Sequence, residues 1–173
     1  MNVSHRELQL LRHAKSDWNA AFNSDISRPL SARGRQAARA MGRWMKQNDI
    51  TQDIVFTSPS TRTRQTLELI AEEISFKIIQ VIDELYHADL DTFLEILGQV
   101  PREHNRVMLV GHNPGMQDLL VYLSAADLEE APGKLFPTTA FARLQLPRDW
   151  NGLSSGAGHL HTLIRPRELL ADE

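Results

Sequence analysis

The sequence predicts an α/β protein, a three-layer α/β/α sandwich in which helices cover both faces of a mostly parallel central sheet. The first observation is that short apolar runs typical of strands alternate with segments whose apolar residues recur at helical spacing. Strand-helix-strand units of this kind form parallel sheets that are buried on both faces. The second observation is that no repeat, low-complexity block or linker divides the 173 residues, which predicts a single domain over residues 1–173.

Each predicted element follows from its own pattern. The expected strands lie at 8–11, 54–57, 77–82, 107–110, 140–146 and 159–164. The expected helical faces consist of Ala37, Met41, Trp44 and Met45; of Leu67, Ile70, Ala71 and Ile74; of Phe93, Leu94 and Leu97; and of Met116, Leu119, Leu120 and Leu123. These stripes are interpreted as core, with Trp44 and Leu120 as its anchors. Irregular connections are expected at 128–137 and 152–158, where Pro, Gly and Ser collect.

Composition excludes several classes of function. A net charge of −3 argues against general nucleic-acid binding, which needs many clustered cations. The sequence contains no cysteine, so disulfides, thiolate metal sites and a cysteine nucleophile are excluded. It also has neither the apolar core of a signal peptide nor a run of about 18 apolar residues that could span a bilayer. We therefore expect a cytoplasmic protein without a membrane partner.

Polar side chains follow four of the predicted strands at the point where each strand ends. Arg12 and His13 come after the first strand, Arg62 after the second, Glu84 after the third and His112 after the fourth. Ligands of open α/β sheets bind outside the carboxyl ends of the strands. Guanidinium groups bind tetrahedral oxyanions through two parallel hydrogen bonds. The pattern therefore predicts a phosphate site at one edge of the sheet.

Simpler interpretations exist for each residue by itself. Arg62 could be a solvated helical side chain, His112 a loop histidine in a Gly-Pro turn, and Glu84 a cap of the following turn, but together they would require four coincidences. The segment "GHNPG" lacks the Lys-Ser/Thr of a nucleotide-binding loop. His159 and His161 stand two residues apart on a strand, and because no third ligand is indicated nearby, we predict no metal and no cofactor.

Several motifs resemble the histidine phosphatase superfamily, which includes the phosphoglycerate mutases. They are "LRHAKSDWN", "SPSTRTRQT" and "GHNPG", in that order along the chain. "ISRPLSARGRQAARAMGRWM", "LFPTTAFARLQL" and "IRPREL" are similar to elements of its small phosphohistidine phosphatase branch, the SixA type. The likeness runs from about residue 10 to residue 146. It implies a phosphoglycerate mutase-like fold without a large cap insertion.

The resemblance also implies roles for individual residues. His13 would be the phosphorylated nucleophile, and Arg12, Arg62 and His112 would hold the phosphoryl oxygens, with His112 also catalytic. Glu84 matches the position of the acid of the family, and Asn19 matches an asparagine that reaches the phosphate in mutase-like members. Ala14 and Lys15 depart from the Gly and Glu of mutases, which weakens the case for a mutase.

The predicted function is metal-independent hydrolysis of phosphohistidine, or of another exposed phosphorylated group, on a partner protein. Only about twenty residues separate Glu84 from the next strand, so we expect a shallow, open pocket, edged by Lys15, Arg28 and Arg64. A broad phosphomonoesterase that acts on small molecules remains an alternative. So does a catalytically silent protein that only binds phosphorylated groups. The sequence leaves the oligomeric state open.

Overall fold

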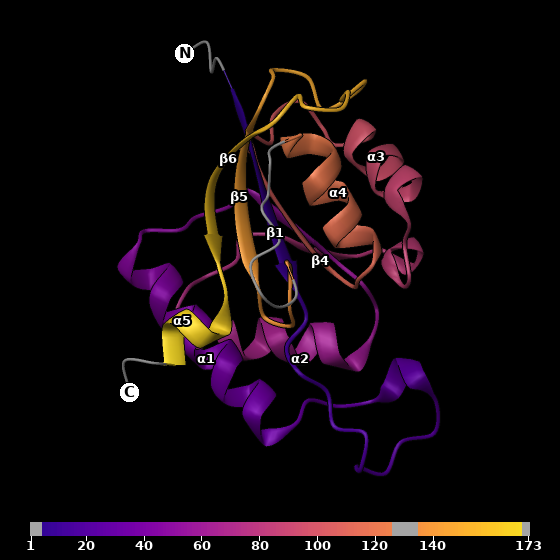
Figure 1. Ribbon diagram of the computed structural model, residues 1–173, viewed down its shortest axis with the longest axis vertical. Coiled ribbons are helices and arrows are strands. Elements are labelled where there is room, and N and C mark those ends of the chain that lie inside the picture. Colours follow the sequence, from indigo (N-terminus) through magenta and orange to yellow (C-terminus); the bar gives the residue numbers. More distant parts are fainter. Residues whose placement is uncertain (1–4, 126–134, 171–173) are drawn as a thin grey trace.

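The structure is built around one twisted sheet (Figure 1), and the computed structural model describes residues 5–125 and 135–170. The strands are β1 (Arg6–Arg12), β2 (Ile54–Thr57), β3 (Ile79–Val81), β4 (Arg106–Gly111), β5 (Phe141–Leu146) and β6 (His159–Ile164). The helices are α1 (Ala32–Gln47), α2 (Thr61–Ile70), α3 (Leu90–Gly98), α4 (Gly115–Ser124) and α5 (Pro166–Leu170), and η1 (Asp25–Ser27) and η2 (Asp83–Leu85) are short 3-10 turns. The irregular connection expected at 128–137 lies mostly outside the described residues.

The strand order is β3-β2-β4-β1-β5-β6. The first four strands of this order run parallel; β5 pairs antiparallel with β1, and β6 pairs antiparallel with β5. β1 and β4 therefore lie at the centre, and β3 forms one edge. The predicted fold class, an α/β sandwich with a mostly parallel sheet, is confirmed. The order of the strands could not be predicted, because the alternation of strands and helices along the sequence does not contain it.

Two apolar cores separate the sheet from its helical layers. On one face, α3 and α4 bury Phe93, Leu97 and Leu120 against Leu8 and Leu10 of β1, among others. On the other face, α1 and α2 pack on the alternate side chains of the same strands, such as Leu11 and Val55. α5 follows the end of β6 and lies against α1 (Figure 1). Both faces of the parallel strands are covered, as expected for such sheets.

The two residues expected to anchor the core differ in burial. Leu120 is fully buried, as expected. Trp44 is only partly buried and presents its ring edge to Phe141, with 5.8 Å between ring centroids. Trp44 therefore packs against the core from its border and is less buried than expected. A side chain as large as an indole is rarely buried in full.

Two glycines allow the loops around the sheet edge to approach closely. A Cβ on Gly34, in the first turn of α1, would lie 2.1 Å from the Lys15 carbonyl oxygen, and one on Gly115, at the start of α4, would lie 1.9 Å from that of Ala88. Ser31 caps α1 by accepting a hydrogen bond from the Gly34 amide, and its hydroxyl donates to the Lys15 carbonyl. Helix starts and strand ends are thus held together where the polar residues collect.

Among residues 5–125 and 135–170, no helix is long and apolar enough to cross a membrane.

Candidate active site

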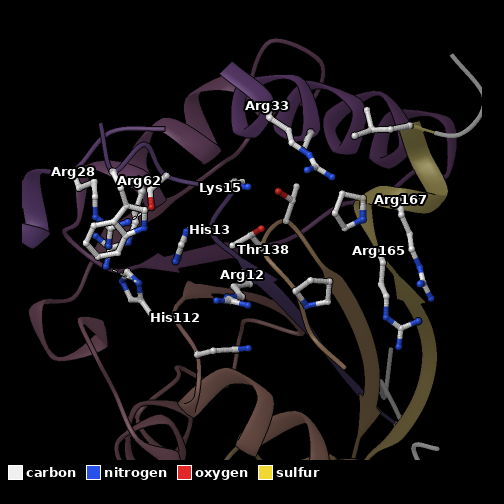
Figure 2. Close-up of a pocket in the computed structure, with 18 of the residues that line it drawn as sticks. Arg12, His13, Lys15, Arg28, Arg33, Arg62, His112, Thr138, Arg165 and Arg167 are labelled. Carbon is white, nitrogen blue, oxygen red and sulfur yellow. Dashed lines mark hydrogen bonds between the residues drawn. The ribbon is translucent and has the colours of Figure 1, made fainter. Parts of the chain in front are cut away.

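Three of the predicted site residues meet at the carboxyl ends of the central strands. His13 directly follows β1, His112 directly follows β4, and Arg62 lies in the first turn of α2, where the capping Ser60 starts the helix after β2. The ring centroids of His13 and His112 are 5.1 Å apart, and Arg62 Nη2 lies 3.4 Å from His112 Nδ1. With Arg12, they line one pocket of about 910 Å³ (Figure 2). Because β2, β4 and β1 are consecutive strands of the sheet, with β4 in the middle, their ends bring these side chains together.

His13 is held in one tautomer by its own backbone. Its Nδ1 lies 2.7 Å from the carbonyl oxygen of Ala14, and a carbonyl can only accept a hydrogen bond, so Nδ1 carries the proton. The lone pair of Nε2 is then free. The pKa of His13 is lowered to about 3, chiefly by burial and in part by the nearby Arg62 and Arg12, while the Ala14 carbonyl acts in the opposite direction. The imidazole is therefore neutral and nucleophilic at pH 7.

His112 is also neutral, with the opposite tautomer. Arg62 Nη2 points at its Nδ1 from 3.4 Å, and because a guanidinium only donates, this nitrogen accepts. Nε2–H therefore donates to the Ser58 hydroxyl at 2.8 Å. Burial first, and then the nearby His13 and Arg62, lower the pKa of His112 to about 2. His112 is thereby fixed in orientation beside the nucleophile.

Two arginines beside His13 are held in place by backbone carbonyl oxygens, and some of their N–H groups have no partner among the described residues. Arg12 Nη1 donates to the Phe136 carbonyl at 3.0 Å, and Arg62 Nη1 donates to that of Asp25 at 2.7 Å. The Nε atoms of Arg12, Arg28 and Arg62 are buried and have no hydrogen-bond partner among the described residues. The guanidinium groups of these three arginines line the pocket, and such groups suit the oxygens of a phosphoryl group.

Asp25 is a site residue that sequence reasoning missed. Its carboxylate accepts hydrogen bonds from the Tyr86 hydroxyl at 2.6 Å, from Arg28 Nη2 at 2.6 Å and from Arg62 Nη2 at 3.1 Å. The Tyr86 bond, followed by the Arg28 bond, holds the pKa of Asp25 well below its usual range. Asp25 therefore positions two arginines. It lies on η1, in the long connection between β1 and α1, where no periodicity indicated a role.

Glu84 and Asn19 are not brought into the pocket. Glu84 is exposed on η2, after the edge strand β3, which lies three strand positions from β1, or about 14 Å at the usual strand spacing. His87, three residues further on, lines the pocket instead, with 5.6 Å between its ring centroid and that of His112. Asn19 is exposed, and its backbone N–H donates to the Asp17 side chain. The structure thus gives the predicted acid position no contact with the site.

The residues at the mouth of the pocket differ in part from those expected. Lys15 is exposed at its rim, but Arg28 is buried beneath Trp18, with its guanidinium 3.6 Å from the ring centroid, and Arg64 does not line the pocket. The volume of 910 Å³ is in the range of small-molecule sites and far exceeds one phosphoryl group. The pocket extends from His13 along α1 to α5 (Figure 2).

No group of three or more His, Asp or Glu side chains among the described residues is arranged to hold a metal ion. His159 and His161 do lie close, with ring centroids 4.9 Å apart on β6, and His161 Nε2 is 2.8 Å from the Gln145 side-chain oxygen. Neither histidine lines the pocket that contains His13.

Comparison with known proteins gives the family of the chain. Residues 8–106 match the model of the histidine phosphatase superfamily (branch 1), and the chain belongs to this superfamily. The chain is 30% identical over 162 residues to the uncharacterized protein Rv1276c of Mycobacterium tuberculosis, which covers 91% of this chain and 100% of that protein.

Solved structures narrow the class to the SixA-type branch. The putative phosphohistidine phosphatase SixA of Agrobacterium tumefaciens superposes with a TM-score of 0.79 at 29% identity, covering 93% of this chain and 98% of that one. The protein histidine phosphatase SixA in complex with tungstate superposes with a TM-score of 0.77 at 26% identity, covering 94% and 99%. The family and these neighbours support a phosphatase of the histidine phosphatase type.

Proposed function

We propose that this protein hydrolyses phosphohistidine, or another exposed phosphorylated group, on a partner protein through a phosphorylated His13. The observation that carries the proposal is the tautomer of His13, whose Nε2 lone pair is free in a pocket shared with Arg12, Arg62 and His112. The names of the SixA neighbours support phosphohistidine as the substrate class. Tungstate, which one of those neighbours binds, has the tetrahedral shape of phosphate.

In the first step, the lone pair of His13 Nε2 forms a bond to phosphorus while the bond from phosphorus to the substrate nitrogen breaks. The bonding electrons go to the leaving nitrogen, which takes up a proton. His13 Nδ1 keeps its proton throughout because the Ala14 carbonyl holds it. Arg12 and Arg62 hold the phosphoryl oxygens in line and counter their charge, while His112 keeps Arg62 oriented through its Nδ1. Phosphoryl transfer requires mainly this positioning.

We assign the proton transfer to His87 rather than to Glu84. His87 lines the pocket beside His112, whereas Glu84 does not. Protonated His87 donates to the leaving group, and the neutral imidazole then takes a proton from the attacking water. Attack of the water oxygen on phosphorus breaks the N–P bond, the electron pair returns to His13 Nε2, and phosphate leaves. The sum is substrate plus water giving the free side chain plus phosphate.

The test is turnover of a phosphohistidine peptide, followed by rapid quench. We expect hydrolysis without added metal, no loss of activity with a chelator, and an acid-labile, alkali-stable phosphoryl group on wild-type protein that is missing from His13→Ala. Much faster turnover of a small sugar phosphate than of the peptide would overturn the substrate class. Loss of activity with the chelator would overturn metal independence, and unchanged activity of His13→Ala would overturn the covalent route.

One observation favours the broad phosphomonoesterase as a second candidate. A pocket of 910 Å³ can enclose a small phosphorylated metabolite as well as admit a protein side chain. The sugar phosphate arm of the same experiment separates the two candidates. Silent binding explains the site less well, because capture of a phosphoryl group does not require a buried nucleophile with a fixed tautomer.

The single domain over residues 1–173 and the cytoplasmic location remain predictions.

A further inference from the structure

The pocket continues past His13 into a second cluster of cations. Lys15 follows β1, Arg33 lies in the first turn of α1, and Arg165 and Arg167 lie at and beside the start of α5, and all four line the same pocket as His13. Figure 2 shows Arg33, Arg165 and Arg167 on one side of His13, and Arg28, Arg62 and His112 on the other. We call Lys15, Arg33, Arg165 and Arg167 the basic arm.

Among the described residues, the basic arm has less counter-charge than the phosphoryl end. At the phosphoryl end, Asp25 pairs with both Arg28 and Arg62. In the basic arm, only Arg165 has a carboxylate near it, Glu168 at 3.7 Å, and its Nε donates to the Leu135 carbonyl. Within residues 5–125 and 135–170, the side chains of Lys15, Arg33 and Arg167 form no ion pair.

Such a cluster requires an explanation, because the chain as a whole is acidic, with a net charge of −3. Like charges at one pocket mouth repel one another and raise the free energy of the folded state, unless an anion binds there. Arginine is suited to carboxylate and phosphate oxygens through two parallel hydrogen bonds. One phosphoryl group occupies only the His13 end. The remaining volume and charge therefore suit a second anionic group of the substrate.

We propose that the basic arm binds acidic side chains that flank the phosphorylated residue of a protein substrate. This proposal rests on the proposed function. The exposure of Lys15, Arg33 and Arg167 favours a protein substrate, because carboxylates of a docked protein surface can reach side chains that project to the solvent from three separate segments. The second phosphate of a small metabolite would instead be expected to meet buried, oriented donors such as those at the phosphoryl end.

The test compares two phosphohistidine peptides that differ only in whether Glu or Gln flanks the phosphorylated residue. With the wild-type protein at low salt, we expect a kcat/KM about tenfold higher for the acidic peptide, or about 1.4 kcal/mol. In the double variant Arg33→Gln/Arg167→Gln, the two peptides should have about equal kcat/KM. The matched control is Arg64→Gln/Arg102→Gln, which removes the same charge from exposed positions outside the pocket and should keep the preference. The preference should also shrink in 0.5 M salt.

The outcomes separate this proposal from the one on which it rests. If neither peptide is hydrolysed while an aryl phosphate is, the proposed function fails and the inference falls with it. If both peptides are hydrolysed at equal rates by wild type, or if the arm variant keeps the preference, the function stands and the inference is overturned. Equal loss in the arm variant and the charge-matched control would overturn it too, because only net charge would then matter. A bisphosphorylated metabolite preferred over the acidic peptide would overturn the choice of a protein partner.

Discussion

The two ends of the pocket are both rich in cationic side chains but are built in different ways. At the phosphoryl end, His13, Arg62 and His112 are almost fully buried and oriented by named hydrogen bonds. In the basic arm, Lys15, Arg33 and Arg167 are exposed and free of ion pairs within the described residues. Buried, pre-oriented groups can stabilise a transition state, whereas exposed ones are screened by water and salt. The difference assigns chemistry to one end and substrate selection to the other.

The largest expected effect is the loss of the nucleophile at the buried end. His13→Ala should lower kcat for an aryl phosphate by about a thousandfold or more, since no other group in the pocket presents an imidazole lone pair with its tautomer fixed by a carbonyl. Steady-state turnover measures this directly. Arg33→Ala serves as the comparison from the exposed end and should lose far less. A similar loss in the two variants would contradict the division between the ends.

The next effect tests whether orientation, and not charge alone, distinguishes the two ends. Arg62→Lys keeps the charge but removes the planar donors that reach the Asp25 carbonyl and carboxylate and His112. We expect kcat to fall by about 100-fold, as for the loss of one oriented donor. Arg33→Lys, which keeps the charge of an exposed side chain, should change kcat/KM for the acidic peptide by less than about threefold. Equal effects at both positions would show that charge alone matters at the buried end.

A smaller effect distinguishes the two candidates for proton transfer. His87→Gln should slow hydrolysis of an alkyl phosphate by about 10- to 100-fold, but should affect an aryl phosphate little, because a good leaving group needs no proton. Glu84→Gln, which changes an exposed side chain outside the pocket, should leave both rates within about twofold. The leaving-group dependence of kcat in the two variants decides between them. A selective loss in Glu84→Gln would restore the acid that the family resemblance implied.

The sequence indicated the buried end better than the rest of the site. His13, Arg62 and His112 each stand near the end of a predicted strand, and the local pattern, with the rule that parallel strands end at one edge, suffices to group them. The same rule misplaced Glu84, because the rule does not say which strands are neighbours in the sheet. β3 lies at the edge of the sheet, so the chain must turn back before His87 reaches the pocket.

Other parts of the site depend on contacts that no local pattern encodes. Asp25 reaches Arg62 across 37 residues and Tyr86 across 61. The basic arm brings Arg33 of α1 and Arg165 beside α5 together, more than 130 residues apart in the sequence, through the packing of α5 on α1. "IRPREL" was noticeable as a motif, but only the fold shows that Arg165 and Arg167 line the pocket of His13.

The smallest effect concerns stability and follows from the burial of His13. The unfolded chain binds a proton on this imidazole below its ordinary pKa of about 6.5, whereas in the folded protein burial lowers the pKa to about 3. Between these values the unfolded state binds more protons, so the free energy of unfolding falls as the pH falls. Moving from pH 7 to pH 5 should cost on the order of 1 to 2 kcal/mol from His13 alone. His13→Gln removes this titration and should lose that much less stability over the same interval in urea unfolding, while Arg33→Gln should follow the wild type. If the pH dependence of wild type and His13→Gln were parallel, His13 would not be buried in its neutral form, and the physical distinction between the two ends of the pocket would fail.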